Sequence, residues 1–257
     1  NPVGGDVVRV ALPEYPRHAD TPDQPFVLLE DDATRTYVAQ SGLVGPNGTD
    51  TREGRPTWAA AQPSYSLDEG QKELNVDLTL DQGGGVQIIK RYTFERGSYL
   101  VRVSHIVRNN GNQPWQGALY GQIKRDGSDD PGKSTQGFIP MPTYLGAAYW
   151  SEEKPYNKLP FDDIQEDPLK LTQEGGWIAM LQHYFVSAWV PDAQGRYTYS
   201  TVYRQNRDEY LLRFVGANQE VAPGEEKVFY AEFYTGPKVQ DHLEAISPGL
   251  NMTVDYG

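Results

Sequence analysis

Residues 74–108 read LNVDLTLDQGGGVQIIKRYTFERGSYLVRVSHIVR, and this stretch decides the fold. From 74 to 80, apolar residues alternate with polar ones, which is the period of a strand with one buried face. The glycine-rich residues 81–85 tolerate the positive φ angles of a turn, so residues 86–95 are expected to return as the second strand of a hairpin. Residues 99–108 repeat the alternation after a second turn. The stretch therefore predicts three antiparallel strands in a meander.

The same two-residue period extends over much of the rest of the chain. Further strands are predicted at residues 5–12, 26–30, 35–40, 115–124, 177–190, 197–204, 209–216 and 226–235. The chain contains 17 tyrosines, and their rings suit the half-buried positions of large sheets. A chain of 257 residues without a low-complexity linker can bury one large core. We therefore expect a single all-β domain over residues 1–257.

One helix is expected near residues 236–248, at the C-terminal end of the sequence. Val239, Leu243 and Ile246 recur at i, i+4 and i+7, and Pro237 fits the first turn. We expect this apolar stripe to dock on the sheet and to hold the helix there.

An irregular excursion near residues 124–175 interrupts the strand pattern. It is rich in proline, glycine and acidic residues and lacks a long period of either kind. Its aromatic residues include Phe138, Tyr144, Tyr149, Trp150, Tyr156 and Phe161. Rings flanked by polar residues are typical anchors of protein interfaces, so we predict a partner-binding surface here. The alternative is that the loop packs its own rings onto the sandwich.

The composition excludes several classes of function. With 35 acidic and 23 basic residues the net charge is −12, which disfavours nucleic acid as a partner. The chain has no cysteine, which rules out thiolate chemistry and disulfides and is compatible with a bacterial cell-envelope protein. No apolar run in the sequence is long enough to span a bilayer.

Residues 127–134, GSDDPGKS, match the pattern of a phosphate-binding loop. That loop works only when a helix follows it, and Gly137, Pro140 and Pro142 are incompatible with such a helix. We therefore reject a nucleotide site. A calcium loop is equally unsuited, because Pro131 stands where its central glycine is required.

No residue of the sequence is predicted to be catalytic, to bind a cofactor or to bind a metal. The histidines at 18, 105, 183 and 242 lack the spacing of metal ligands, and no G-x-S-x-G motif is present. His105 and His183 lie in predicted strands, where either could act as a general base at a concave sheet. A satisfied histidine in or beside the core is the ordinary alternative.

Six short motifs occur in order along nearly the whole chain: GGDV at 4–7, LPEYP at 12–16, QSGL at 40–43, GAAY at 146–149, GGWIAMLQ at 175–182 and TVDYG at 253–257. In this ordered set the chain resembles the large periplasmic domain of the Gram-negative YidC membrane-protein insertases. The resemblance implies a β-supersandwich of the galactose-mutarotase type with a C-terminal helix. It also implies a periplasmic domain of a bacterial inner-membrane protein, whose membrane-embedded segments lie outside this sequence.

The resemblance further implies a non-enzymatic domain that assists insertion and folding of inner-membrane proteins. It would act as a binding and scaffolding module for SecD/SecF and other Sec translocon components, without a cofactor. Nascent membrane-protein segments are further candidate partners, held in a chaperone-like groove. The alternative is a carbohydrate-binding or sugar-epimerising protein of mutarotase-like fold, which would require His105 or His183 in an open cleft beside a carboxylate.

Overall fold

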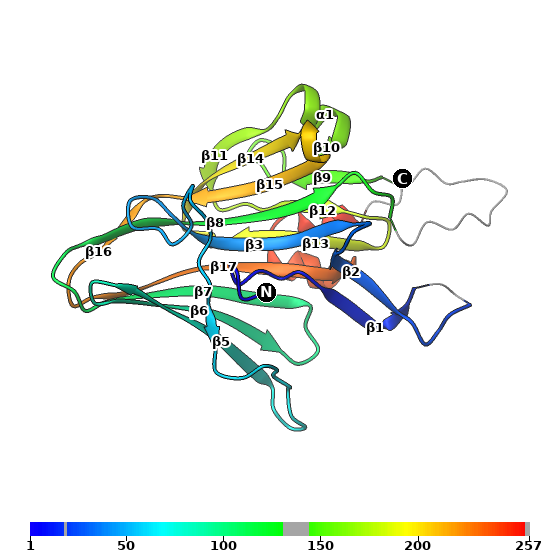
Figure 1. Ribbon diagram of the computed structural model, residues 1–257. Coiled ribbons are helices and arrows are strands. Elements are labelled where there is room, and N and C mark those ends of the chain that lie inside the picture. Colours follow the sequence, from blue (N-terminus) through cyan, green and yellow to red (C-terminus); the bar gives the residue numbers. More distant parts are fainter. Residues whose placement is uncertain (18–19, 131–143, 255–257) are drawn as a thin grey trace.

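Two antiparallel sheets form a sandwich in the computed structural model, which describes residues 1–17, 20–130 and 144–254 (Figure 1). The predicted meander is confirmed. It comprises β5 (Glu73–Gly83), β6 (Val86–Glu95) and β7 (Leu100–Asn109), with Leu74 opposite Phe94 and Phe94 opposite Val101. The glycine-rich turn has positive φ at Gly83, Gly84 and Gly85.

The meander belongs to a nine-stranded sheet of order β10-β9-β12-β13-β17-β7-β6-β5-β4. Its other strands are β4 (Ala59–Ala60), β9 (Gly146–Tyr149), β10 (Asn157–Pro160), β12 (Ile178–Leu181), β13 (Phe185–Pro191) and β17 (Glu226–Pro237). The central strand β17 has β7 on one side and β13 on the other.

The opposite sheet has eight strands in the order β1-β2-β3-β8-β15-β14-β11, with β16 paired to β8. Its members are β1 (Val10–Pro16), β2 (Pro25–Asp31), β3 (Thr36–Val44), β8 (Trp115–Asp126), β11 (Lys170–Glu174), β14 (Arg196–Arg204), β15 (Glu209–Gly216) and β16 (Gln219–Val221). A 3-10 turn, η1 (Gln205–Arg207), joins β14 to β15.

Large aromatic side chains join the two sheets in the main core. The Trp189 ring, from the nine-stranded sheet, lies 5.8 Å from that of Phe214 in the other sheet and 4.8 Å from that of Phe233. Its indole N–H donates to the main-chain oxygen of Gln122 at 3.1 Å. A Cβ atom at Gly121 would lie 2.4 Å from the Phe214 ring, so glycine is required for this packing. Full burial of each such side chain stabilises the fold by roughly 1.5–3 kcal/mol.

The prediction of one strand over residues 177–190 is wrong, because the chain turns back at residues 182–184. β12 and β13 pair as a hairpin, and the Gln182 N–H donates to the Phe185 oxygen at 3.0 Å. Every residue of both strands is buried. Both faces of the strands are apolar, so the sequence shows a continuous apolar run in which the turn is concealed.

The C-terminal helix is present but shorter than expected. α2 spans Gln240–Ile246, and a 3-10 turn, η2 (Leu250–Thr253), follows it. Pro237 is not in the first turn of the helix, because it ends β17 opposite Phe185. Near the start of the chain, the expected strand over 5–12 is also displaced: β1 begins at Val10, and before it Val7 forms only an isolated bridge.

The excursion near 124–175 contains more regular structure than its sequence indicates. It includes the strands β9, β10 and β11 and a short helix, α1 (Phe161–Glu166). β9 and β10 extend the nine-stranded sheet, whereas β11 is an edge of the eight-stranded sheet. The two parts of the excursion thus belong to different sheets.

Candidate interaction surface

A second apolar cluster lies on the outer face of the nine-stranded sheet, away from the main core. Its buried members are Ala148, Trp177, Ala179, Leu181, Val186, Ala188, Val190, Tyr234, Leu243 and Leu250. They come from β9, β12, β13 and β17, from Trp177 just before β12, and from the C-terminal helical segment. A sheet that is apolar on both faces requires cover on both. We call the covering segments, which are Tyr144, residues 150–156 and residues 239–254, the outer cap.

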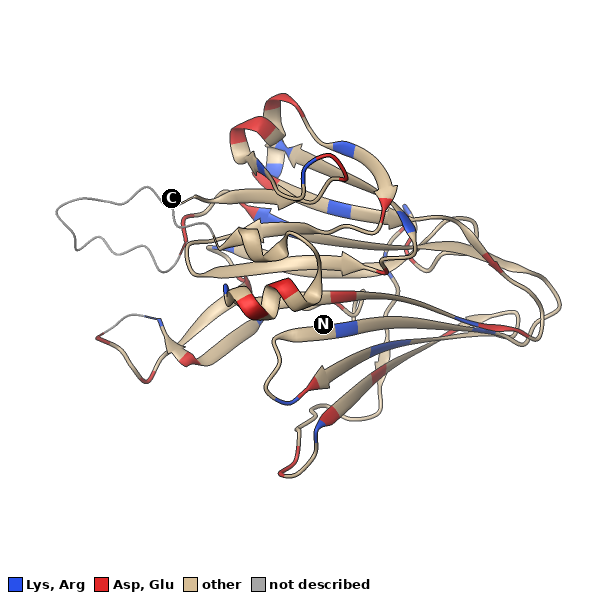
Figure 2. Cartoon of the chain, turned by 180° about the vertical axis from the view of Figure 1, so that it is seen from behind, with Lys and Arg blue, Asp and Glu red and all other residues tan. Residues whose placement is uncertain are grey.

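The helix α2 supplies one half of the outer cap and lies in front of the sheet in Figure 2. Leu243 is fully buried, and Ile246 is partly buried against the same cluster. Val239, the third residue predicted to dock, is the N-cap of the helix and is 36% exposed. The acidic residues Asp241 and Glu244 are exposed on the helix.

Trp177 joins the two halves of the outer cap. Its indole N–H donates to the Pro248 oxygen at 2.9 Å, and its main-chain oxygen accepts the Trp150 N–H at 3.1 Å. Gly249 has φ +79°, and a Cβ atom there would lie 2.3 Å from the Pro155 oxygen. The C-terminal segment and the excursion therefore meet at a close backbone approach that only glycine allows.

The aromatic residues predicted as partner contacts are divided between the two apolar clusters. Tyr144, Trp150 and Tyr156 pack on the outer cluster with α2, and the Tyr144 hydroxyl donates to the Ala147 oxygen at 2.7 Å. Tyr149 and Phe161 pack on the main core instead. All five are partly buried, and Phe138 lies outside the described residues.

Three apolar side chains of the cap and of the adjoining turn remain open to solvent. Tyr184 is 66% exposed, Met252 48% and Val239 36%. The Lys238 N–H donates to the Tyr184 oxygen at 2.9 Å, which holds the β12–β13 turn beside the start of α2. The sequence patterns did not mark Tyr184 or Met252 as surface residues, because neither is part of a periodic stripe.

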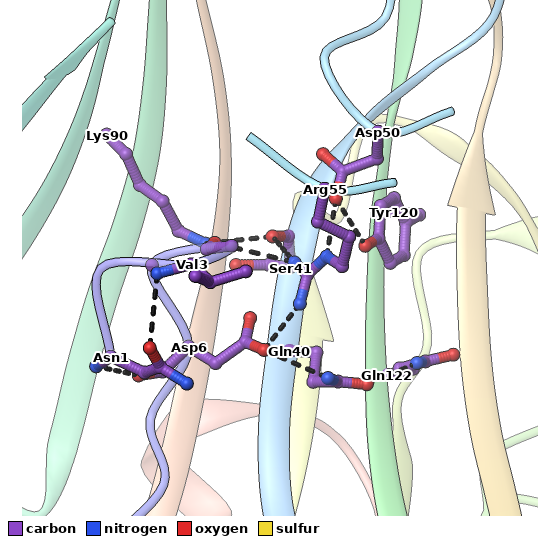
Figure 3. Close-up of polar contacts among 12 residues, drawn as sticks. Asn1, Val3, Asp6, Gln40, Ser41, Asp50, Arg55, Lys90, Tyr120 and Gln122 are labelled. Carbon is purple, nitrogen blue, oxygen red and sulfur yellow. Dashed lines mark hydrogen bonds and ion pairs between the residues drawn. The ribbon is translucent and has the colours of Figure 1, made fainter. Parts of the chain in front are cut away.

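A buried polar cluster holds the N-terminal segment between the sheets (Figure 3). The sequence patterns did not predict this cluster. Arg55 forms ion pairs with Asp6 and with Asp50, the second at 2.6 Å. The Lys90 ammonium donates to the Gly4 oxygen at 2.9 Å and to the Ser41 oxygen at 2.8 Å.

Lys90 is fully buried, and burial lowers its pKa to about 7. A cavity of about 280 Å³ lies beside this cluster, lined in part by Asp6, Gln40 and Lys124. One signal in the sequence could have revealed the cluster. Lys90 stands at an inward position of β6, between the inward Ile88 and Tyr92, and a buried lysine requires polar partners.

His105 does not meet the requirement for a sugar-processing base. It is fully buried, and within the described part of the chain neither ring nitrogen has a hydrogen-bond partner. Burial, followed by the charges of Lys90 and Arg55, holds the pKa of His105 well below its ordinary value. His183 is exposed in the β12–β13 turn, where its ring lies 4.0 Å from that of Tyr184.

Only part of the loop resembling a nucleotide site can be placed, because residues 131–134 lie outside the described residues. In the part that is described, the Ser128 N–H donates to Asp126 at 3.2 Å and the Gly127 N–H donates to Asp208 at 3.3 Å. These amides are therefore occupied by carboxylates of the chain itself. Over residues 1–17, 20–130 and 144–254 there is no group of three or more side chains suited to a metal ion.

Comparison with known proteins decides the family. The family model described as "YidC periplasmic domain" matches residues 1–257. The chain belongs to this family. It is 71% identical to the "Membrane protein insertase YidC" of Alcanivorax borkumensis, over all of the chain and 44% of that protein. With the protein of the same name from Cellvibrio japonicus it shares 47% identity, over all of the chain and 46% of that protein.

The YidC periplasmic domain is part of an inner-membrane insertase, and this chain is therefore a periplasmic domain that spans less than half the length of these relatives. Within the described residues, no helix has the length and apolar character needed to cross a bilayer.

Similar solved structures are known at low sequence identity. A galactose mutarotase related enzyme of Lactobacillus acidophilus has 9% identity and a TM-score of 0.47, over 77% of the chain and 83% of that protein. A GH36 alpha-galactosidase of Geobacillus stearothermophilus has 11% identity and a TM-score of 0.49, over 84% of the chain and 33% of that protein.

Proposed function

We propose that this domain is a non-catalytic binding and scaffolding module that assists the insertion and folding of inner-membrane proteins. Its partners in this proposal are SecD/SecF and other Sec translocon components. The observation that carries it is the match of the whole chain to the periplasmic domain of proteins named membrane protein insertases. The burial of His105, without a hydrogen-bonded carboxylate among the described residues, weighs against the carbohydrate alternative.

The outer cap is the contact surface that we propose for these partners. Two segments that the sequence marks separately, the aromatic excursion and the C-terminal helix, lie together here over one apolar cluster. The aromatic rings of Tyr144, Trp150 and Tyr156 are partly buried and pack between the cap and the sheet. The exposed side chains Tyr184, Val239 and Met252 lie on the cap or beside it and remain available for contact. Aromatic and methionine side chains of this kind are enriched in protein interfaces.

The test uses the full-length insertase with Tyr184, Val239 and Met252 all replaced by serine. We expect weaker crosslinking and copurification of SecD/SecF, with unchanged thermal unfolding, because these side chains are exposed. The matched control replaces Val3 and Phe94, which are 49% and 38% exposed, by serine. Equal crosslinking of the triple variant and the wild type would refute the cap as the contact surface.

A further inference from the structure

The strand β17 has a free edge along its first five residues. It contains 12 residues and pairs with β7 from Glu226 onwards. On its other side, pairing with β13 begins only at Ala231, opposite Pro191. Residues 226–230 therefore have a neighbouring strand on one side only, at the end of β17 that lies toward β16 in Figure 1.

The direction of the backbone groups at this edge follows from the ladder. The Thr235 N–H donates to Tyr99 at the β7 side, and the Lys238 N–H donates to Tyr184 at the β13 side. Odd-numbered residues of β17 thus bond toward β7 and even-numbered ones toward β13, and the register with β7 has no shift. The N–H and C=O groups of Glu226 and Val228 consequently point to the side that β13 has left, whereas Tyr230 lies against Asp192, the residue after Pro191.

The backbone groups of Glu226 and Val228 have no backbone partner among the described residues, because residues 219–221 pair with β8 and the chain turns away to β14 after Asp192. Natural edges are commonly protected by proline, by a bulge or by an outward charge. Residues 226–230 contain no proline and no bulge, and their two charged residues, Glu226 and Lys227, are held by other groups. The Lys227 ammonium donates to the Glu220 oxygen at 3.0 Å, and Glu226 pairs with Arg108 at 2.6 Å. The charges beside the edge are therefore already engaged.

A cleft of about 230 Å³ lies along the free edge. It is bounded by Asp192, Arg196 and Tyr197 of the β13–β14 connection, by Leu119 of β8, by Gly216 and by Val228 and Tyr230 of β17. Val228 is 49% exposed. Arg102 stacks at 3.9 Å over the Tyr230 ring on the outer face. The cleft thus combines apolar residues and two charged ones, Asp192 and Arg196, with the unpaired backbone donors and acceptors of Glu226 and Val228.

We propose that this edge binds an extended polypeptide segment, which adds to β17 as a strand and continues the line of β13. Only an extended backbone repeats a donor and an acceptor every two residues, about 6.6 Å apart, as the edge does. The apolar residues of the cleft, with the exposed Val228, accept small or β-branched side chains, while Asp192 and Arg196 place one acidic and one basic group in its lining. The inference deepens the proposed function, on which it rests, by naming a substrate class: unfolded segments of membrane proteins.

The experiment uses the domain and a fluorescent peptide of alternating valine and threonine, with anisotropy as the binding signal. A peptide with N-methylated backbone at alternate residues has the same side chains but cannot complete the ladder. We expect binding of the first peptide only. Hydrogen exchange should slow at the amide of Val228 and remain unchanged at the amides of Lys227 and Phe229, which are already bonded to β7. Equal binding of the two peptides, or no slowing of exchange at Val228, would overturn the proposal.

The matched variants are Val228→Lys and Val3→Lys, because the two valines are equally exposed at 49%. Val228→Lys should weaken peptide binding by about tenfold or more, since an outward lysine protects an edge, whereas Val3→Lys should not. If Val228→Lys instead abolishes a dimer seen by sedimentation, the occupant is a second copy of the chain and the peptide proposal fails. Crosslinking of SecD/SecF should survive Val228→Lys, which separates this inference from the outer cap.

Discussion

The buried ammonium of Lys90 makes the stability of the domain depend on pH in a defined direction. Burial lowers the pKa of Lys90 to about 7 in the folded chain, whereas the unfolded chain keeps the ordinary value of 10.5. Between these values the unfolded chain binds one proton more than the folded chain, so the free energy of unfolding rises with pH. The slope approaches about 1.4 kcal/mol per pH unit, which gives about 2 kcal/mol between pH ~7.5 and pH ~9.

Between pH ~7.5 and pH ~9, the change in stability comes from Lys90 and not from the groups that face it. The charges of Asp6 and Asp50 raise the pKa of Lys90 and that of Arg55 lowers it, but burial is the largest cause of the shift. The neighbouring His105 has a lowered pKa, so its contribution to stability is lost only as the pH falls below about 6.5. Burial raises the pKa of Tyr92, so its phenol affects stability only as the pH approaches 10.

Urea unfolding followed by tryptophan fluorescence measures the effect, with Lys90→Met as the comparison. The methionine keeps the length of the side chain but cannot titrate. It also removes the donors to the Gly4 and Ser41 oxygens, which lowers stability at every pH without affecting the slope. We expect the wild type to gain about 2 kcal/mol over the window relative to the variant. Parallel curves for the two proteins would refute a buried lysine that is neutral above pH 7.

Two further predictions concern the outer cap, and both are measured by urea unfolding. Leu243→Ala should lower the free energy of unfolding by about 2–5 kcal/mol because the side chain is fully buried, while the exposed Glu244→Ala should change it by less than about 0.5 kcal/mol. Equal effects would contradict docking of α2. Gly249→Ala should cost about 2–4 kcal/mol, since φ is +79° and the new Cβ would clash with the Pro155 oxygen. Gly70→Ala, at φ +85° with open space around it, should lose only about 1 kcal/mol, and equal losses would argue against the close approach.

Local patterns predicted those elements whose two faces differ in polarity. The alternation at 74–80 predicted β5, because one face of this edge region is apolar and the other is polar. Residues 177–190 gave no such signal, because the main core covers one face of β12 and β13 and the outer cap covers the other. The stripe of Leu243 and Ile246 was visible for the same reason as β5. The sequence did not show that Val239 lies outside the helix, because the last strand continues to Pro237.

The remaining parts of the site depend on contacts between distant segments. Asp6 and Arg55 are 49 residues apart, and no local pattern relates them until the N-terminal segment lies between the sheets. The division of the excursion rings between two clusters likewise depends on which sheet each short strand joins. The free edge of β17 arises from a difference in length between two strands, and lengths at strand ends are poorly marked in sequence.

The rigidity of β17 has a geometric consequence for any ligand of the domain. The strand begins at the free edge and ends at Pro237, three residues before α2 of the outer cap. From Val228 to Pro237 it spans about 30 Å of continuous sheet. The strand would therefore set the distance between a partner bound at the cap and a peptide bound at the edge. Two weak contacts at a set distance raise the local concentration of one ligand around the other without any additional binding energy.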